Sequence, residues 1–252
     1  MAKIVLIIYF LIFIWSFLIE PNLLIVKHYE IKSLQNKKIV FASDFHIAKH
    51  EKRRLEKIVK TINKQNPDLV LLGGDFIKGH DGKNTMPINK QVQILKQIHA
   101  PVVSVIGNHD GWFNKEEVIR TLKNNGIPVL VNENINIGDI YIAGVDDVQT
   151  GEPNVKKALV GCVGKTILIT HNPDVYYDVN KKIDLILAGH VHGGQIRAPF
   201  VGALIAPSRY GTKLANKYVF NETQNTMIVS RGLGTSIFPL RFCCIPDIIV
   251  IN

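Results

Sequence analysis

Five short apolar runs in the body of the chain are each followed within three residues by a polar side chain. A short apolar run between polar residues is typical of a strand that is buried on both faces. The runs are residues 38–42, 69–72, 102–106, 167–169 and 185–188. Ligands of α/β proteins bind at the carboxyl ends of such strands. We therefore expect the polar residues that follow the five runs to meet at one edge of a sheet.

The segments between these runs carry apolar residues at helical spacing. These residues are Leu55, Ile58, Val59 and Ile62 in the first helix, and Val92, Leu95 and Ile98 in the second. A third helix is expected to begin at Asn114, where Glu117 completes a capping box, and to end at Gly126. Residues 135–142 are typical of a hairpin with a two-residue turn. Strands that alternate with helices in this way predict an α/β fold.

The first segment of the chain has a different pattern. Residues 4–19 are apolar and contain no charged residue. A helix that spans a membrane needs about 17 to 25 residues, so this segment lies at the lower edge of that range. Glu20-Pro21-Asn22 offers no small-residue cleavage site, which favours an uncleaved anchor over a signal peptide. We expect an N-terminal membrane anchor over residues 1–26 and one domain over residues 27–252. A buried core helix is the alternative.

Lysines flank the apolar segment unevenly. Lys3 precedes it, whereas Lys27, Lys32, Lys37 and Lys38 follow it. Because positive residues favour the cytoplasmic side of a membrane, we expect the anchored body to face the cytoplasm. The formal net charge of +9 and the pI near 9.4 favour anionic partners such as phosphates or lipid headgroups. A solvated, lysine-rich surface explains the same charge. The three cysteines do not resemble a disulfide framework.

The loop Gly189-His190-Val191-His192-Gly193 places two histidines one residue apart between glycines. Such a tight loop would aim both imidazoles at a metal centre, although a pair of partly exposed loop histidines is the alternative. The other four strand ends carry aspartate, asparagine and histidine, which favours the metal centre. A mixed set of imidazole, carboxylate and amide oxygen suits Mn²⁺, Fe or Zn²⁺.

These strand ends resemble the five signature blocks of the calcineurin-like metallophosphoesterase superfamily. The blocks are Asp44-x-His46, Gly74-Asp75, Gly107-Asn108-His109-Asp110, His171 and Gly189-His190-x-His192. The resemblance implies a four-layer αββα sandwich with a dinuclear metal centre at the carboxyl ends of the strands. The C-terminal part also resembles a bacterial membrane-associated branch of the superfamily. That similarity lies in Gly193-Gly194-Gln195, residues 230–234, Pro239-x-Arg241-Phe242 and Pro246-Asp247. Because the branch more often has glutamate at the last position, the role of Asp247 stays open.

The resemblance also implies which residues bind the metals. The first ion would be bound by Asp44, His46, Asp75 and His192. The second would be bound by Asp75, Asn108, His171 and His190, so that Asp75 bridges the two ions. Such centres hold their ions about 3.5–4 Å apart, and a metal-bound hydroxide attacks the phosphorus in line. We expect two divalent cations, with Mn²⁺ favoured over Fe or Zn²⁺.

His109 is the expected proton donor to the leaving oxygen, because the resemblance leaves it outside the ligand set. Asp110 would orient its ring and raise its pKa toward neutrality, as suits a general acid. A structural histidine is the alternative. Arg231 and Arg241 are expected to bind a substrate phosphate, although a surface or salt-bridge role explains them equally well. The remaining histidines match no signature block: His28, His50, His80 and His99.

Two further segments bear on the substrate. Residues 197–217 contain an apolar run with basic residues on both sides. A hydrophobic strip with basic edges beside a phosphoesterase centre suits a lipid-linked phosphate at a bilayer surface, although a buried hairpin explains the same residues. Residues 78–89 form a polar loop that either faces the substrate or is merely mobile. Some members of the superfamily cleave the pyrophosphate of UDP-2,3-diacylglucosamine in lipid A synthesis, which is the most specific substrate that the resemblance offers.

We therefore expect a metal-dependent phosphoesterase that is anchored in the bacterial inner membrane and hydrolyses a phosphodiester or pyrophosphate, with a lipid-linked substrate preferred. A general phosphodiesterase or phosphatase that acts on a small substrate is the alternative. A non-catalytic scaffold is disfavoured, because all seven ligand positions and His109 hold suitable residues. A nuclease is disfavoured as well, since no basic patch is interleaved with aromatic residues, and no nucleic-acid partner is expected.

Overall fold

The computed structural model describes residues 2–252, whose body is built on two facing β-sheets. The first sheet has the strand order β1-β13-β2-β3-β4. Its strands are β1 (Ile25–Tyr29), β13 (Asp247–Ile251), β2 (Ile39–Ala42), β3 (Leu69–Leu72) and β4 (Val102–Ser104). Strands β2, β3 and β4 are parallel neighbours, so their carboxyl ends lie at the same edge of the sheet.

The second sheet has the strand order β11-β12-β8-β7-β6-β5. Its strands are β11 (Val219–Phe220), β12 (Met227–Val229), β8 (Leu185–Ala188), β7 (Lys165–Thr170), β6 (Ile140–Gly144) and β5 (Glu133–Ile137). Strands β6, β7, β8 and β12 are parallel. The predicted hairpin is confirmed, because β5 and β6 are antiparallel and Ile137 pairs with Ile140 across the turn.

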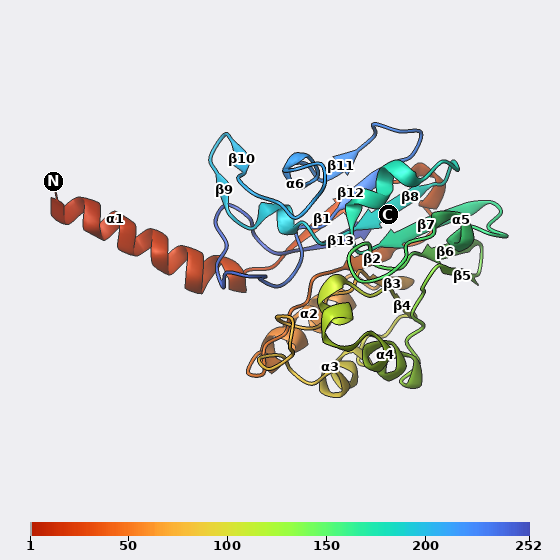
Figure 1. Cartoon of the computed structure of the whole chain (residues 1–252), viewed down its shortest axis with the longest axis horizontal. Coiled ribbons are helices and arrows are strands. Elements are labelled where there is room, and N and C mark those ends of the chain that lie inside the picture. Colours follow the sequence, from red (N-terminus) through yellow and green to blue (C-terminus); the bar gives the residue numbers. More distant parts are fainter. Residues whose placement is uncertain (1) are drawn as a thin grey trace.

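Alternate residues of the strands face two different cores. The odd-numbered residues of β2 and β8 lie in one core between the two sheets. The even-numbered residues of β2 lie in a second core, and those of β8 lie in a third. Because each sheet separates two cores, the molecule has four layers, and the expected αββα sandwich is confirmed (Figure 1).

The two outer layers differ in how regular they are. Helices α2 (Lys52–Asn63), α3 (Ile88–Leu95) and α4 (Asn108–Asn124) cover the first sheet. The four apolar residues predicted for the first helix are all buried there. The second sheet is covered by short segments, namely α5 (Val155–Ala158), α6 (Lys213–Asn216) and a 3₁₀ helix (Pro173–Asp178).

Helix α4 begins six residues earlier than the sequence predicts, at Asn108. The predicted cap is present, because the Asn114 side chain accepts a hydrogen bond from the Glu117 backbone at 3.1 Å. It lies at a kink inside the helix, where Asn114 has φ −172° and ψ 92°. The first turns of α4 lack apolar periodicity, which is why the sequence pattern did not show them. Gly126 follows the helix with a φ of 81°, as expected for its end.

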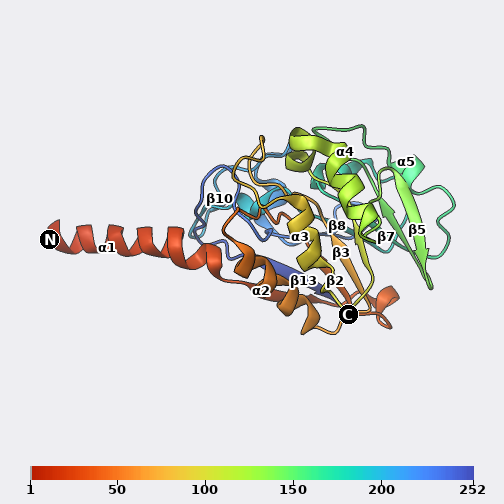
Figure 2. The same cartoon turned by 90° about the horizontal axis from the view of Figure 1, so that it is seen from below.

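The N-terminal segment projects from one end of the body, away from both sheets (Figures 1 and 2). It consists of α1 (Ala2–Ile14), a π-helical turn (Trp15–Ile19) and a 3₁₀ turn (Glu20–Asn22). Its apolar side chains are exposed; Leu6 and Tyr9 are each 67% accessible. The alternative of a buried core helix is therefore wrong. Lys3–Asn22 has the length and composition of a membrane span, although a signal sequence passes the same test.

The remaining elements are small. A short hairpin of β9 (Arg197–Ala198) and β10 (Gly202–Ala203) lies near the place where the N-terminal segment joins the body (Figures 1 and 2). Two further 3₁₀ turns are Lys32–Leu34 and His192–Gly194. The second of these turns follows β8 and contains one of the predicted metal ligands.

Candidate metal centre

The five predicted strand ends meet where the carboxyl edges of the two sheets adjoin. Strands β2, β3 and β4 lead to Asp44, Asp75 and Asn108, and strands β7 and β8 lead to His171 and His190. All five side chains are buried, with no more than 4% of any residue exposed. The expectation that these residues gather at one edge is confirmed.

The backbone is strained at most of the predicted ligands. Left-handed φ angles occur at Asp44 (57°), His46 (42°), Asp75 (57°), His190 (69°) and His192 (49°). Non-glycine residues avoid this region, and each such conformation costs on the order of 1–3 kcal/mol. Strain of this kind persists only where the surrounding structure imposes it, and it clusters at functional sites. The fold therefore holds these loops in conformations that the local sequence alone would not adopt.

Two glycines let the backbone approach the ligands closely. A Cβ atom at Gly107 would lie 2.2 Å from Asp75 Oδ1, and one at Gly189 would lie 2.4 Å from Asp44 Oδ2. These distances are shorter than a carbon–oxygen contact allows, so neither position accommodates a side chain. The glycines of the signature blocks thus make room for the two carboxylates.

The Asp75 carboxylate lies between two imidazoles. Its Oδ2 atom is 3.3 Å from His46 Nε2 and 3.3 Å from His171 Nε2. The opposite ring nitrogens lie 2.8 Å from the carbonyl oxygens of Ile77 and Gly73, respectively. Because a carbonyl only accepts, both Nδ1 atoms carry a hydrogen, and both Nε2 atoms point at the carboxylate. At this distance a proton on Nε2 or a metal ion would satisfy the contact.

The spacing of the other ligand atoms fits metal coordination. Metal–ligand bonds of about 2.1 Å place neighbouring ligands about 3.0 Å apart in an octahedron and about 3.4 Å apart in a tetrahedron. The observed separations are 3.2 Å for His46 Nε2–His192 Nε2, 3.3 Å for His192 Nε2–Asp44 Oδ1, 3.0 Å for His171 Nε2–Asn108 Oδ1 and 3.2 Å for His190 Nδ1–His171 Nε2.

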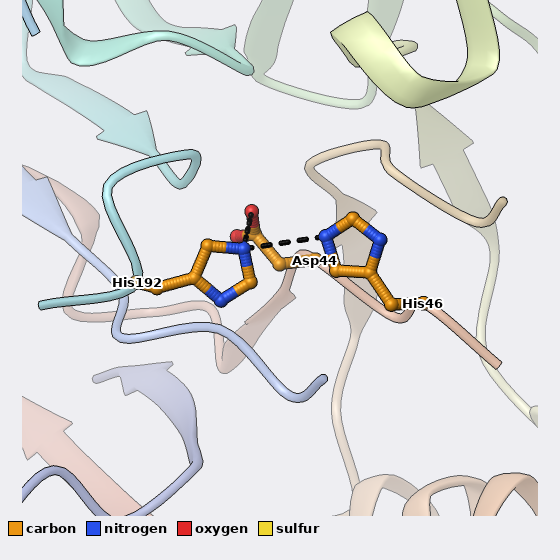
Figure 3. Close-up of side chains that lie close together, drawn as sticks. All are labelled: Asp44, His46 and His192. Carbon is orange, nitrogen blue, oxygen red and sulfur yellow. Dashed lines mark hydrogen bonds and ion pairs between the residues drawn. The ribbon is translucent and has the colours of Figure 1, made fainter. Parts of the chain in front are cut away.

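These contacts divide the cluster into two halves that share Asp75. Asp44, His46 and His192 form the first half, and Figure 3 shows their side chains turned toward one another from two loops, one after β2 and one after β8. His171, Asn108 and His190 form the second half. The division is the one that the superfamily resemblance implies. Asp44 also links the halves, because its carboxylate accepts the backbone N–H of His190 at 3.0 and 3.1 Å.

The protonation of the cluster shows where it favours positive charge. Burial alone would lower the pKa of His171, but the negative charge of Asp75 raises it to about 10. Burial alone would raise the pKa of Asp75, but the imidazoles of His171 and His46 hold it well below its usual range. Burial lowers the pKa of His190 to about 3 and that of His192 well below its usual value. The site thus stabilises a cation beside Asp75 and keeps two imidazoles neutral, as metal ligands must be.

His109 lies at the border of the cluster, with a ring nitrogen within 4.8 Å of ligand atoms of His46 and Asp75. Its Nδ1 atom is 2.8 Å from the Gly79 carbonyl oxygen, and its Nε2 atom is 3.2 Å from the Ser236 hydroxyl. Nδ1 therefore carries the hydrogen and Nε2 accepts. Burial lowers the pKa of His109 to about 4. The expectation that its pKa is raised toward neutrality is wrong.

Asp110 has a different task from the one that the sequence predicts. Its carboxylate accepts the backbone N–H groups of Asp75 (2.9 Å), Phe76 (2.8 Å), Ile77 (3.1 Å) and Gly107 (3.0 Å). These bonds fix the loop that follows β3 against the start of α4. The prediction that Asp110 orients the His109 ring is corrected, because the Gly79 carbonyl holds that ring.

Arg241 is wholly buried, and its guanidinium donates to backbone carbonyls. The acceptors are Gly234 (3.1 Å from Nε), Cys244 (2.9 Å from Nη1), and Arg231 and Gly232 (2.9 and 3.0 Å from Nη2). Nη2 also lies 3.4 Å from His192 Nδ1. The Arg241 side chain therefore connects residues 231–234 to Cys244, next to the predicted metal ligand His192. It presents no surface to a substrate, so the prediction that Arg241 binds a substrate phosphate is wrong.

Arg231 and Asp247 lie close together beside the same segment. The Arg231 guanidinium is 4.6 Å from the centre of the Tyr218 ring, a cation–π geometry. The buried Asp247 carboxylate accepts the Ser230 hydroxyl at 2.6 Å and the Arg231 backbone N–H at 3.1 Å. Asp247 therefore fixes the segment that carries Arg231. The role of Arg231 in binding phosphate stays a prediction.

A profile of the calcineurin-like phosphoesterase family matches residues 37–194, which include all seven predicted ligands. The chain belongs to this family. It is 32% identical over 251 residues to the uncharacterized metallophosphoesterase YkuE of Bacillus subtilis (strain 168), across 92% of this chain and 86% of that protein. It is 30% identical over 224 residues to the phosphodiesterase YaeI of Escherichia coli (strain K12), across 85% and 81%. One solved structure superposes on 76% of this chain and 89% of its own, with a TM-score of 0.51 and 11% identity, which shows the fold alone.

Family membership and the buried cluster together make the chain a metal-dependent phosphoesterase. The donors present fit two divalent ions, because lone pairs of imidazole, carboxylate and amide groups converge on both sides of Asp75. Asp44, His46 and His192 would hold one ion, and Asn108, His171 and His190 would hold the other. Asp75 would contact both ions.

Replacing His109 with asparagine is expected to lower the kcat of this phosphoesterase by on the order of 10²-fold and to leave its metal content unchanged. The asparagine amide can still donate to the Gly79 carbonyl, but it has no nitrogen in place of Nε2. Steady-state hydrolysis of an aryl phosphodiester and elemental analysis of the same samples measure both quantities. His99→Asn, at an exposed position before β4, is the matched control. Equal kcat values for the two variants would contradict a role for Nε2.

Three residues near His109 were not identified from the sequence as site residues. Ser236 bonds its Nε2 atom, and the His80 ring lies 5.2 Å from the His109 ring, centre to centre. Gln195 holds Ser236 in place, since its side chain accepts the Ser236 N–H at 2.8 Å and donates to the Ser236 carbonyl at 3.0 Å. Two of them could have been considered from the sequence. Gln195 belongs to the Gly193-Gly194-Gln195 motif shared with the membrane-associated branch, and His80 lies in the polar loop of residues 78–89.

Proposed function

We propose that the chain hydrolyses a phosphodiester or pyrophosphate bond of a lipid-linked substrate at a membrane surface. The observation that carries this proposal is a set of exposed apolar side chains in two segments that connect to the metal centre. The set comprises Phe200 (109% accessible), Val201 (71%), Leu204 (55%), Ile205 (80%), Ile237 (90%) and Phe238 (58%). We name these six residues the apolar rim. Exposed apolar residues that gather in one place mark sites of contact with membranes or partners.

Short connections join the apolar rim to the metal centre. Ile237 and Phe238 directly follow Ser236, whose hydroxyl lies 3.2 Å from His109 Nε2. The other four residues lie in and after the β9–β10 hairpin, which follows the His192 loop. Gln195 links the two parts, because its side chain donates to the Phe238 carbonyl at 2.9 Å. A lipid that contacts the apolar rim would therefore have its headgroup next to the predicted ligands.

The N-terminal apolar helix is attached to the same region. The buried Glu20 carboxylate accepts the backbone N–H of Cys243 at 3.0 Å, and the Ser16 carbonyl accepts the backbone N–H of Arg241 at 2.9 Å. The Arg241 guanidinium in turn lies 3.4 Å from His192. If α1 lies in a bilayer, these bonds hold the apolar rim and the metal centre near the surface of the same bilayer.

The proposal extends to location and metal. Residues 1–26 anchor the chain in the bacterial inner membrane, and the lysines that follow the anchor favour the cytoplasmic face for residues 27–252. Mn²⁺ is the proposed resident metal, with Fe or Zn²⁺ as alternatives, because a mixed set of imidazole, carboxylate and amide donors suits these three metals. The phosphate-containing substrate and the membrane are the proposed partners, and nucleic acid is not.

The residues of the site would share the chemistry as follows. Two divalent ions bound there supply Lewis acidity, which activates water and offsets charge on the phosphoryl oxygens. Asp75 keeps the two halves of the site together, since both halves contact its Oδ2 atom. Nε2 of His109 carries no hydrogen, so it would accept a proton or a hydrogen bond beside the reacting phosphate, and the Ser236 hydroxyl positions that atom. The Gly79 carbonyl fixes the tautomer of the ring.

Hydrolysis of two substrates by the full chain in neutral detergent micelles tests this proposal. The substrates are UDP-2,3-diacylglucosamine and bis(4-nitrophenyl) phosphate, each with Mn²⁺ and with EDTA. We expect turnover of the lipid nucleotide that EDTA abolishes. Turnover of the aryl diester alone would overturn the lipid assignment and leave a general phosphodiesterase, the activity in the name of the relative from Escherichia coli.

Variants of the apolar rim separate the lipid contact from the chemistry. Serine at both Ile237 and Phe238 is expected to lower kcat/KM for the lipid nucleotide, relative to the aryl diester, by about tenfold or more, because each side chain contributes about 1.5–3 kcal/mol when buried in lipid. The matched control carries serine at Val160 and Val163, which are 69% and 70% exposed. They lie near α5, at the end of the body opposite α1 (Figure 1). Equal ratios in both double variants would contradict the proposal.

A further inference from the structure

A pocket of about 500 Å³ lies between the N-terminal segment and the catalytic body. One wall is apolar and comes from the end of that segment, with Phe17 and Pro21. The opposite wall comes from α2 and from the loop after β3, with Arg53, Arg54 and Lys78. The pocket thus combines an apolar side that is continuous with the proposed anchor and a cationic side that belongs to the body.

The cationic wall carries more positive than negative charge. Three cationic side chains face one carboxylate, Glu51, which already accepts the Ala48 N–H at 2.7 Å and pairs with Arg54 at 3.3 Å. Among residues 2–252, the Lys78 ammonium has no carboxylate within 4.0 Å, and its polar contact is the Thr235 hydroxyl at 3.3 Å. Burial lowers the pKa of Lys78, so its charge is incompletely stabilised. An anion in the pocket would supply the missing partner.

The pocket adjoins the reacting part of the site through two routes. Lys78 precedes Gly79, whose carbonyl oxygen lies 2.8 Å from His109 Nδ1. Thr235 precedes Ser236, whose hydroxyl lies 3.2 Å from His109 Nε2. The cationic wall is therefore adjacent in the chain to the two residues that contact the ring nitrogens of His109. Any group bound there would be part of the same substrate or a close neighbour of it.

We propose that this pocket binds a phosphate group of the substrate other than the one that is cleaved. A phosphate brings up to two negative charges and several acceptor oxygens, which match Lys78 and Arg53, since neither has a carboxylate within 4.0 Å in the part of the chain that the structure describes. The apolar wall of Phe17 and Pro21 accommodates the first carbons of an acyl chain that leads back along the anchor. The inference rests on the proposed function and narrows the substrate class to lipids that carry a second phosphate near the scissile bond.

Binding measurements on the full chain in neutral detergent micelles test the pocket without catalysis. EDTA is present, so that metal ions make no contribution, and titration calorimetry gives the Kd for dioctanoyl phosphatidic acid. We expect Lys78→Gln and Arg53→Gln each to raise this Kd by about tenfold, as the loss of one charge-assisted hydrogen bond predicts. Lys83→Gln is the matched control, because Lys83 lies in the same loop and is 82% exposed in a pair with Asp81. Its Kd is expected to equal that of the unchanged chain.

Two further titrations decide between sources of the phosphate. Inorganic phosphate is expected to bind at least tenfold more weakly than dioctanoyl phosphatidic acid, and dioctanoyl phosphatidylcholine, whose headgroup has no net charge, is expected not to bind. Equal affinity for inorganic phosphate would overturn the lipid part of the proposal. Equal Kd values for Lys78→Gln, Arg53→Gln and Lys83→Gln would overturn the pocket itself. Asp75→Asn is expected to retain the binding of phosphatidic acid, so loss of hydrolysis and loss of this pocket are distinguishable.

Discussion

The Asp75→Asn protein is expected to lose at least about 10³-fold in kcat on any phosphoester that the chain hydrolyses. Asparagine has the same shape, so the loop after β3 keeps its hydrogen bonds to Asp110. It removes the negative charge that lies 3.3 Å from both His46 and His171. The two halves of the site would then lose their common ligand, and binding of the second ion is expected to fail first.

Metal content and activity, measured on the same samples, check this expectation. Elemental analysis after dialysis against Mn²⁺ gives the number of ions per chain, and an aryl phosphodiester gives kcat. Asp139→Asn is the matched control, because Asp139 is an exposed residue of the β5–β6 turn that pairs with Lys165. If the Asp75→Asn protein keeps both ions and a tenth or more of its activity, Asp75 is not the shared ligand.

The sequence predicts the position of the metal ligands well because their placement follows from where the buried strands end. Asp44, Asp75, Asn108, His171 and His190 follow an apolar run within three residues, and parallel neighbouring strands must end at the same edge. The runs at β2 and β8 are buried on both faces, which made them recognisable without any alternation of polar residues. The four layers were implied by the resemblance to the superfamily, and the burial of β2 and β8 on both faces agrees with them.

The partners of these ligands were not predictable in the same way. Asp110 is next to His109 in sequence, yet helix geometry directs its carboxylate to the backbone of the loop after β3. The His109 ring is instead fixed by a carbonyl that lies thirty positions earlier in the chain. Sequence proximity suggests a contact between side chains, but neighbours on a helix point in different directions. Only the tertiary arrangement shows which acceptor each ring nitrogen meets.

The apolar run within residues 197–217 was open to two interpretations, a buried hairpin or a strip that contacts lipid. The structure shows that some apolar residues of this segment are buried and others are exposed. Ala203 and Leu214 are buried, as an ordinary hairpin core would be. Phe200 and Ile205 are exposed, as a strip that contacts lipid would be. Alternation of buried and exposed apolar residues has no signature in composition, because both groups have the same hydrophobicity. Their separation depends on how the short hairpin is seated on the body.

Replacing Arg241 with methionine is expected to lower the free energy of unfolding by about 3 kcal/mol or more, because four buried carbonyl groups lose their donor. The carbonyls belong to Arg231, Gly232, Gly234 and Cys244. Metal binding is expected to weaken as well, since the guanidinium lies 3.4 Å from His192. A substrate-binding arginine would show the opposite pattern, with a raised KM and unchanged stability.

Urea unfolding of the full chain in micelles, combined with the Kd for Mn²⁺, distinguishes these two roles of Arg241. Arg241→Lys keeps the charge but lacks the planar fork of donors, so it is expected to recover only part of the lost stability. Arg120→Met is the matched control, because Arg120 is an exposed residue of α4 and its replacement should change stability by less than about 0.5 kcal/mol. If Arg241→Met and Arg120→Met unfold at the same urea concentration, the hydrogen bonds of Arg241 do not stabilise the fold. The bonds of Arg241 connect the C-terminal segments to the His192 loop. If Arg241→Met loses both stability and affinity for Mn²⁺, the same residue supports the fold and the metal centre.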